Sequence, residues 1–234
     1  MVDVIARRRL EKDGLTYEVL IYKPEPHGTR HFACRWSLVD RNGATVKSQQ
    51  LYGIDTAQAL TFVLLLMDLM LGPGFTYADK KDTGFPLFRP AEGSGKPGSY
   101  FLSSAGERWF WEGGLSTASV GEDVVRAMDV VARRDAERDG RGYQVLIEKP
   151  RRVSESEFVC RWVVVDRVGE VVESYRACGE DSAAALVSAV LSVSPCLGSR
   201  FTCDGEDGAG FPRYRPAVEA GAPGSWVLPF TDEL

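Results

Sequence analysis

Cysteine is the residue type in this 234-residue chain whose placement most directly raises the question of chemistry. Two of the five cysteines stand in nearly the same surroundings, Cys34 in FACRWSLVD and Cys160 in FVCRWVVVD. Alternate residues of a strand share a face, so each of these cysteines lies between a Phe and a Trp on an apolar face. Burial in such surroundings raises the pKa of a thiol and lowers its reactivity. We therefore expect Cys34 and Cys160 to be core residues rather than nucleophiles.

The other metal-binding residue types do not form a recognisable set. The five cysteines include no C-x-x-C pair, which predicts reduced thiols and no zinc site. The two histidines, His27 and His31, share one loop without an evident third ligand. The acidic loops YADKKDTG and CDGEDGAG do not have the D-x-[DN]-x-[DN]-G spacing of a calcium loop. We expect no metal ion and no cofactor.

Two arginines are candidate binding residues. Arg89 and Arg215 both stand in the pattern GFP-x-[FY]-R-P-A, between an aromatic residue and a proline. The guanidinium fork suits a carboxylate or a phosphate, and in the groove between two halves of the chain it would bind a small ligand. A structural ion pair or an aromatic stack that holds the loop is the favoured alternative.

An acidic loop and an aromatic cluster complete the candidate binding set. The acidic side chains of the second loop suit a basic partner: Asp204, Glu206 and Asp207. Trp109 and Trp111 belong to the run RWFW. Consecutive aromatic residues either fill a groove in their own molecule or anchor a partner protein, and large exposed aromatic patches are rare on monomers.

The chain repeats itself at an offset of 126 residues. The two halves then align without a gap, and about 46 of the 106 positions compared are identical. We expect residues 1–102 to form a first unit, residues 103–126 a connector rich in Gly and Ser, and residues 127–234 a second unit. What the duplication has kept are turn, cap and core residues rather than an acid-base or nucleophile set.

Each half contains the same predicted elements. In the first half, β-rich segments flank Asp13-Gly14 and DRNG, which predicts two hairpins. Asp55 or Thr56 is the expected N-cap of a helix over about 56–71 that ends at Gly72. In the second half Asp181 or Ser182 caps a helix over about 183–193, which Pro195 is expected to end. The predicted fold class is α+β: two homologous units, each an antiparallel sheet of four to five strands packed on one helix.

Composition sets limits on the partner and the compartment. The net charge of −5 and the absence of long basic runs argue against nucleic acid and anionic membranes as partners. The short basic runs ARRR, at Ala6–Arg9, and KPRR, at Lys149–Arg152, are interpreted as solvated surface. The N-terminus does not have the pattern of a signal peptide, so we expect a cytoplasmic protein.

The pattern IARR, Y-x-V-x-I-x-K-P, C-R-W and G-x-D-x-x-x-A-L resembles a family of short uncharacterised bacterial proteins. The resemblance covers about seventy residues of each half, and the second half departs from it at Ala184, where the family has glutamine. It implies a strand-rich start leading into a capped helix and brings no activity. In size and general character such chains resemble the immunity and inhibitor proteins of bacterial toxin systems, and this likeness is an analogy only.

We therefore expect a non-enzymatic protein that binds another protein, such as an immunity or inhibitor protein that neutralises a bacterial toxin or enzyme. Residues 127–234 carry the whole excess of acidic over basic residues, which suits a basic partner. The alternative is a small-ligand-binding protein or an enzyme whose site lies in the groove between the two halves. A structural subunit is a third possibility. The sequence leaves the oligomeric state open.

Overall fold

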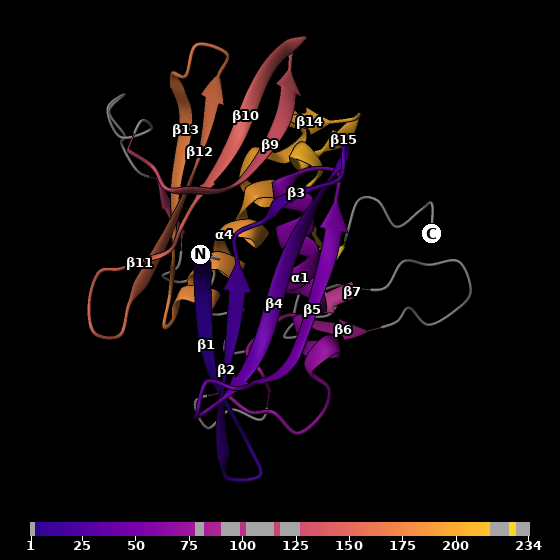
Figure 1. The fold of residues 1–234 in the computed structure, drawn as a ribbon. Coiled ribbons are helices and arrows are strands. Elements are labelled where there is room, and N and C mark those ends of the chain that lie inside the picture. The colour runs from indigo at the N-terminus through magenta and orange to yellow at the C-terminus, as the bar shows by residue number, and fades with distance from the viewer. Residues whose placement is uncertain are drawn as a thin grey trace.

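The computed structural model describes residues 3–77, 82–89, 99–101, 115–117, 127–215 and 225–227. Within these ranges it contains two main antiparallel sheets, two long helices and a small third sheet (Figure 1). The α+β class predicted from the sequence is confirmed at this level. Trp109 and Trp111, both predicted binding residues, lie outside the described residues.

The first sheet comes from the N-terminal half of the chain. Its strands are β1 (Val4–Lys12), β2 (Leu15–Tyr22), β3 (Glu25–His27), β4 (His31–Asp40) and β5 (Thr45–Gly53). Strand β4 pairs with β2 and β3 on one side and with β5 on the other. Strands β1 and β5 are therefore the two edges of this sheet.

The second sheet contains the same arrangement and extra strands at both edges. Strands β9 (Val130–Arg138), β10 (Arg141–Glu148), β12 (Phe158–Asp166) and β13 (Val171–Gly179) lie in that order, and β11 (Arg151–Arg152) pairs with β12. Strand β14 (Thr202–Cys203) pairs with β9 and with β15 (Glu206–Asp207), while β8 (Leu115–Thr117) pairs with β13. The segment expected to be a connector thus supplies an edge strand to the second sheet.

The third sheet joins the ends of the two halves. Its order is β16 (Arg213–Arg215), β17 (Ser225–Val227), β7 (Ser99–Phe101) and β6 (Leu87–Arg89). Short strands are predicted near residues 100–102 and 226–228, where β7 and β17 lie. These segments are expected to wrap their own units, but β17 pairs with β7 at Trp226 and Tyr100.

Helix α1 (Thr56–Leu71) has the predicted limits. The Asp55 carboxylate accepts a hydrogen bond from the Gln58 backbone N–H, and Gly72 ends the helix at a φ of 81°. Helix α4 (Ser182–Leu197) is capped by Asp181 in the same way. It passes through Pro195, so the prediction that this proline ends the helix is wrong. Two short 3-10 turns follow, η1 (Gly198–Arg200) and η2 (Gly208–Gly210).

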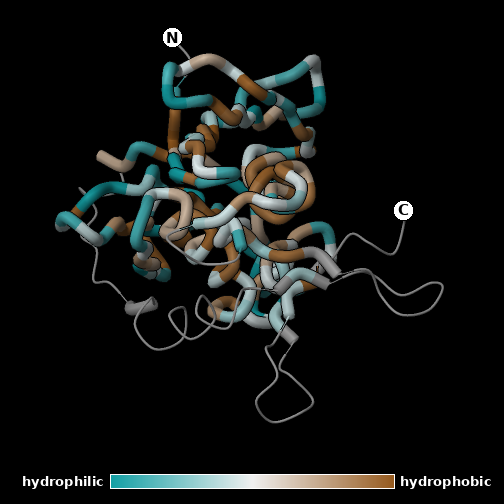
Figure 2. The backbone as a smooth tube through the Cα atoms, turned by 90° about the horizontal axis from the view of Figure 1, so that it is seen from below, coloured by the Kyte–Doolittle hydropathy of each residue, from teal (hydrophilic) through white to brown (hydrophobic). Residues whose placement is uncertain are grey.

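The core lies between the two sheets. Each helix packs on two strands of its own sheet and against the first strand of the other sheet. Figure 2 shows hydrophobic positions gathered on the helices and inner strands, and hydrophilic positions mainly on the outer segments. Cys34, Trp36, Cys160 and Trp162 are all fully buried, so the prediction of core cysteines is confirmed. Burial raises the pKa of both thiols.

The stretch Ser182–Arg200 is long and apolar enough to be considered as a membrane span. However, 67% of it is buried inside the molecule. It packs on β12 and β13, as expected of a core helix.

Candidate functional site

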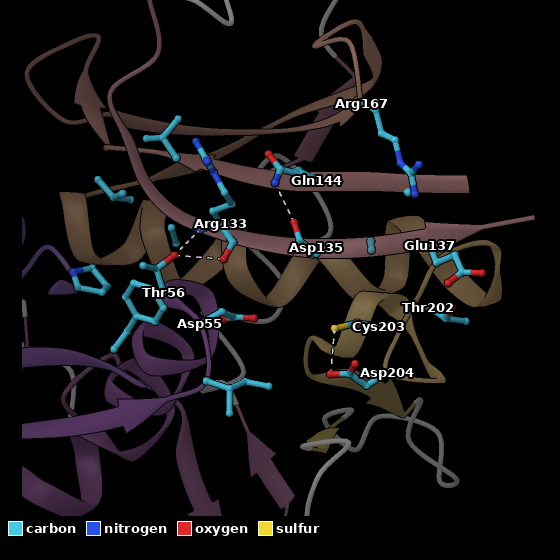
Figure 3. A pocket seen from close by; sticks show the side chains of 18 of the residues that line it. Asp55, Thr56, Arg133, Asp135, Glu137, Gln144, Arg167, Thr202, Cys203 and Asp204 are labelled. Carbon is cyan, nitrogen blue, oxygen red and sulfur yellow. Dashed lines mark hydrogen bonds between the residues drawn. The ribbon is translucent and has the colours of Figure 1, made fainter. Parts of the chain in front are cut away.

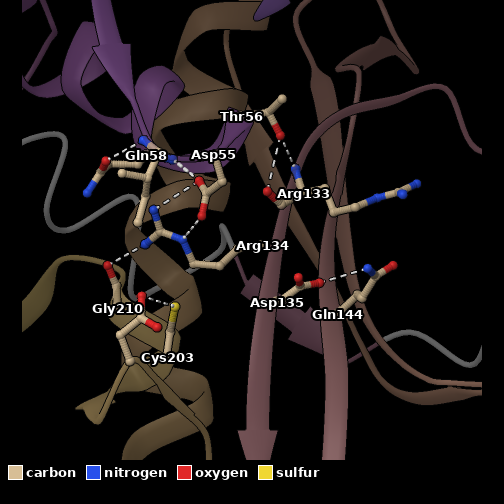
Figure 4. Close-up of polar contacts among 11 residues, drawn as sticks. Asp55, Thr56, Gln58, Arg133, Arg134, Asp135, Gln144, Cys203 and Gly210 are labelled. Atoms are coloured by element: carbon tan, nitrogen blue, oxygen red, sulfur yellow. Dashed lines mark hydrogen bonds and ion pairs between the residues drawn. The ribbon is translucent and has the colours of Figure 1, made fainter. Parts of the chain in front are cut away.

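Two buried arginines connect the halves of the molecule. The Arg134 guanidinium on β9 donates from Nε and Nη2 to the two carboxylate oxygens of Asp55, at 2.8 and 3.1 Å (Figure 4). Its Nη1 donates to the Gly210 carbonyl at 2.6 Å. The Arg134 side chain is 2% exposed. The N-cap of the first helix is therefore held by the first strand of the second sheet, in the two-pronged geometry that arginine allows.

An equivalent contact joins the first strand of the first sheet to the N-cap of the second helix. Arg8 on β1 donates from Nε and Nη2 to Asp181 at 2.9 and 3.1 Å and from Nη1 to the Thr83 carbonyl at 3.2 Å. Arg8 is buried, whereas the neighbouring Arg7 and Arg9 are exposed. The interpretation of ARRR as solvated surface is therefore wrong for its middle arginine, because a partner 173 residues away neutralises it. We call these two ion pairs the paired latches.

Sequence reasoning assigns Asp55 and Asp181 to helix capping alone and passes over both arginines. One signal was available: Arg8 alternates with Ala6 and Leu10 on the buried face of β1. An arginine on a core face needs an ionic partner, because an unpaired buried charge is very unfavourable. The spacing of residues in the sequence does not say which acid that partner is.

The shared GFP motif packs on the latches. The Phe85 ring lies 4.5 Å from the Arg8 guanidinium, and the Phe211 ring lies 4.9 Å from that of Arg134. A side chain at Gly84 would collide with Arg8, since a Cβ there would lie 2.7 Å from Nη1. Cation–π contact thus explains the Phe of the motif in both halves, and close approach to Arg8 explains Gly84 in the first.

A groove of about 830 Å³ is lined by Asp55, the acidic partner of Arg134, and by residues of β9 (Figure 3). Strands β9 and β10, the start of α1 and the β14 loop line it, together with Lys23, Pro24 and Phe32 of the first half. Its polar lining consists of Lys23, Asp55, Thr56, Arg133, Asp135, Glu137, Gln144, Arg167, Thr202, Cys203 and Asp204. A volume of this size lies in the range of small-molecule sites, although charges of both signs line it.

Much of the polar lining of the groove is already paired. The Thr56 hydroxyl donates to the Arg133 carbonyl and accepts from the Arg133 backbone N–H. Gln144 donates to Asp135 at 2.8 Å. The pKa of the Cys203 thiol is raised to about 11, mainly by burial, so this thiol is protonated at neutral pH. The groove can therefore offer hydrogen bonds and charges, and its cysteine is a poor nucleophile.

Strand β5 is a second candidate site because no strand among the described residues pairs with its outer edge. In an antiparallel pair, every second residue directs its backbone N–H and C=O toward the partner strand. The Asp40 N–H donates to the Ala44 carbonyl, so Asp40 and every second β4 residue before it face β5. The β5 residues paired with these β4 residues also direct their backbone groups inward. The residues between them, Ser48, Gln50 and Tyr52, therefore direct their N–H and C=O groups away from β4. All three side chains are exposed, and within the described residues no strand pairs with this edge.

The matching edge of the second sheet is occupied. Strands β4 and β5 pair in the same register as β12 and β13, shifted by 126 residues. Strand β8 pairs with Tyr175, Arg176 and Ala177 of β13. The corresponding residues of β5 are Gln49, Gln50 and Leu51.

No protein-family model and no curated protein matches this chain. Among solved structures, an acyl-ACP thioesterase from Bacteroides thetaiotaomicron is 11% identical to it, with 76% of this chain and 75% of that chain covered and a TM-score of 0.16. A likeness this low carries no argument about fold or function.

The predicted site residues that the structure describes do not come together in one place. Asp204 lines the groove, and Glu206 and Asp207 form the adjacent β15. Arg89 and Arg215 end β6 and β16, the two edge strands of the third sheet, so two strands lie between them. In the described part of the chain, no three His, Cys, Asp or Glu side chains are placed to hold a metal ion.

Proposed function

We propose that the protein is a non-enzymatic protein that binds another protein, and that the open edge of β5 is its binding site. The observation that carries the proposal is the contrast between two equivalent edges: β13 has taken up β8, and β5 has not taken up a described strand. Unpaired edges attract other strands, and proteins usually protect them with charge or proline. The only charged residue of β5 is Lys47, whose ammonium donates to the Met70 carbonyl of α1.

The proposal includes the origin of the two edges. The chain is taken to be two homologous units produced by tandem duplication, in which the copies have diverged in use. The common register of the two sheets and the paired latches support this view. In the second copy the β13 edge is then covered by β8, and in the first copy the β5 edge binds a partner.

The proposed class of partner rests on the charge of the second half and on the analogy with small immunity and inhibitor proteins. Residues 127–234 contain 13 basic and 18 acidic residues, whereas residues 1–126 contain 15 of each. An acidic half favours encounter with a basic protein. We propose a cytoplasmic immunity or inhibitor protein with a basic toxin or enzyme as its partner.

The test removes one backbone donor from the edge. In Gln50→Pro the outward N–H is lost while the inward bonds to β4 are kept; Gln50→Thr keeps the N–H. A photo-reactive residue at Ser48 in the native host is expected to crosslink one protein in the wild type and in Gln50→Thr, and not in Gln50→Pro. The same residue at Leu15, the exposed first residue of β2, is the control. A partner that Gln50→Pro retains, or the lack of any crosslinked protein, would contradict the proposal.

The groove supports a second candidate, binding of a small polar ligand. The observation that favours it is a lining of charged and amide groups in a space of ligand size. Native mass spectrometry of protein purified from the host tests it. A retained mass of several hundred daltons that Arg133→Ala loses would support the groove, and an unliganded mass would contradict it.

A further inference from the structure

Helix α1 runs alongside the open edge of β5. At one end, a Cβ placed on Gly53 would lie 2.9 Å from the Gln58 Cβ, so the first turn of the helix touches the end of the strand. At the other end, the Lys47 ammonium donates to the Met70 carbonyl. The helix and the strand are therefore in contact at both ends.

The helix row between these two contacts is apolar. Gln58, Phe62, Leu66 and Met70 follow one another at intervals of four and so lie on one side of the helix. The three apolar members are only half-buried, and the neighbouring Leu69 is 62% exposed. Half-buried apolar side chains beside an unpaired strand edge form a surface that a partner can cover.

The second half shows that this row is a departure from the other copy. Phe62 and Leu66 correspond to Ser188 and Ser192, which are buried in α4. Ser192 accepts a hydrogen bond from the Trp162 Nε1 at 2.9 Å. With Leu66 in place of that serine, the buried Trp36 Nε1 has no partner among the described residues. The first half therefore keeps an apolar surface at the expense of a buried hydrogen bond.

We infer that β5 and this helix row together bind an extended, amphipathic strand of a partner protein. The strand would lie antiparallel to β5 opposite Gln49–Leu51, as β8 does on β13, with apolar side chains at alternate positions facing Phe62, Leu66 and Met70. Such strand addition takes affinity from the backbone and selectivity from the side chains. This inference rests on the proposed function and names the chemistry of the partner segment.

A second copy of the chain fits this surface less well. The β5 residues that face the helix side are those paired with the core residues Cys34, Trp36 and Leu38, namely Leu51, Gln49 and Lys47. Two of these three residues are polar, so a second β5 at the edge would place an amide and an ammonium over the apolar row. The alternating apolar strand of a different protein is the better occupant.

Two labelled peptides of one composition test the inference with the purified full chain: Ser-Val-Ser-Val-Ser-Val-Ser and Val-Val-Val-Ser-Ser-Ser-Ser. Fluorescence anisotropy is expected to show at least tenfold tighter binding of the alternating peptide. Phe62→Ser and Leu66→Ser, which install the residues of the other copy, are expected to remove that preference. Gln50→Pro is expected to weaken the alternating peptide at least tenfold, and Gln50→Thr to leave it unchanged. Thermal unfolding checks that each variant is folded.

The outcomes separate this inference from the proposed function. Equal affinity for both peptides, lost in Gln50→Pro, would overturn the amphipathic preference and leave the edge as the binding site. Binding that Gln50→Pro does not change would contradict both. Failure of the wild type to bind either peptide would overturn the inference. A dimer in sedimentation analysis that Gln50→Pro dissociates would show that a second copy is the occupant.

Discussion

At the scale of residues, the repeated cysteines are packing groups. The Cys34 thiol donates to the Tyr22 carbonyl at 3.4 Å and the Cys160 thiol to the Glu148 carbonyl at 3.1 Å. Both bonds require a protonated sulfur, and both sulfurs are buried. What the two halves share at this position is therefore an inert, hydrogen-bonded core group.

Buried thiols with raised pKa values make the fold sensitive to alkali. Above pH ~9 the thiols of the unfolded chain ionise while those of the folded chain keep their protons, so the free energy of unfolding falls as the pH rises. The expected slope is about 1.4 kcal/mol per pH unit for each thiol. Urea unfolding between pH 7 and pH 10.5 measures it, with Cys34→Ala/Cys160→Ala as the control that shows a shallower decline. Rapid alkylation of either thiol in the native protein would contradict this prediction.

At the scale of elements, α4 continues through a proline because another residue replaces the missing bond. Pro195 has no N–H to give to the Leu191 carbonyl four residues earlier. The Trp226 indole of β17 donates to that carbonyl at 3.3 Å. A tertiary contact thus satisfies the carbonyl that the proline leaves free, which local sequence rules do not include.

This replacement predicts coupling between the two residues. Trp226→Phe removes the indole donor and is expected to lower the free energy of unfolding by ~1–3 kcal/mol beyond the loss of packing. In the Pro195→Ala background the new Ala N–H can bond to Leu191, so the same Trp226 substitution should cost less. A double-mutant cycle by urea unfolding measures the difference. Additive effects would show that the indole bond does not compensate for the proline.

At the scale of the whole molecule, the paired latches hold the two halves together. Each latch joins the first strand of one sheet to the helix N-cap of the other, and each buries an arginine. Removing one partner of a buried ion pair leaves an uncompensated charge, which is far less favourable than the loss of an exposed pair.

Asp181→Asn tests the contribution of one latch. Asparagine still caps the helix, so the substitution removes mainly the charge opposite Arg8. We expect the free energy of unfolding to fall by ~3–5 kcal/mol. Asp139→Asn is the matched control: its side chain is 90% exposed, and asparagine tolerates its positive φ of 52°. If both substitutions had equally small effects, the latch would not hold the halves together.

Local sequence patterns were sufficient to predict the first hairpin, the limits of α1 and the burial of two cysteines. Asp13-Gly14 set the first hairpin because both residues adopt a positive φ, and Asp55 and Gly72 bounded α1 because capping acts within a few residues. The alternation around Cys34 and Cys160 was enough to place both thiols inside.

Contacts between elements that are distant in the sequence could not be predicted in this way. The Arg8–Asp181 latch, the pairing of β8 with β13 and the contact of Trp226 with Leu191 join residues that are 35 to 173 residues apart. Local patterns carry no information about such partners, because burial, pairing and edge exposure arise only when the two halves pack together. The difference between the β13 edge, which pairs with β8, and the β5 edge, with which no described strand pairs, is therefore visible only in the folded molecule.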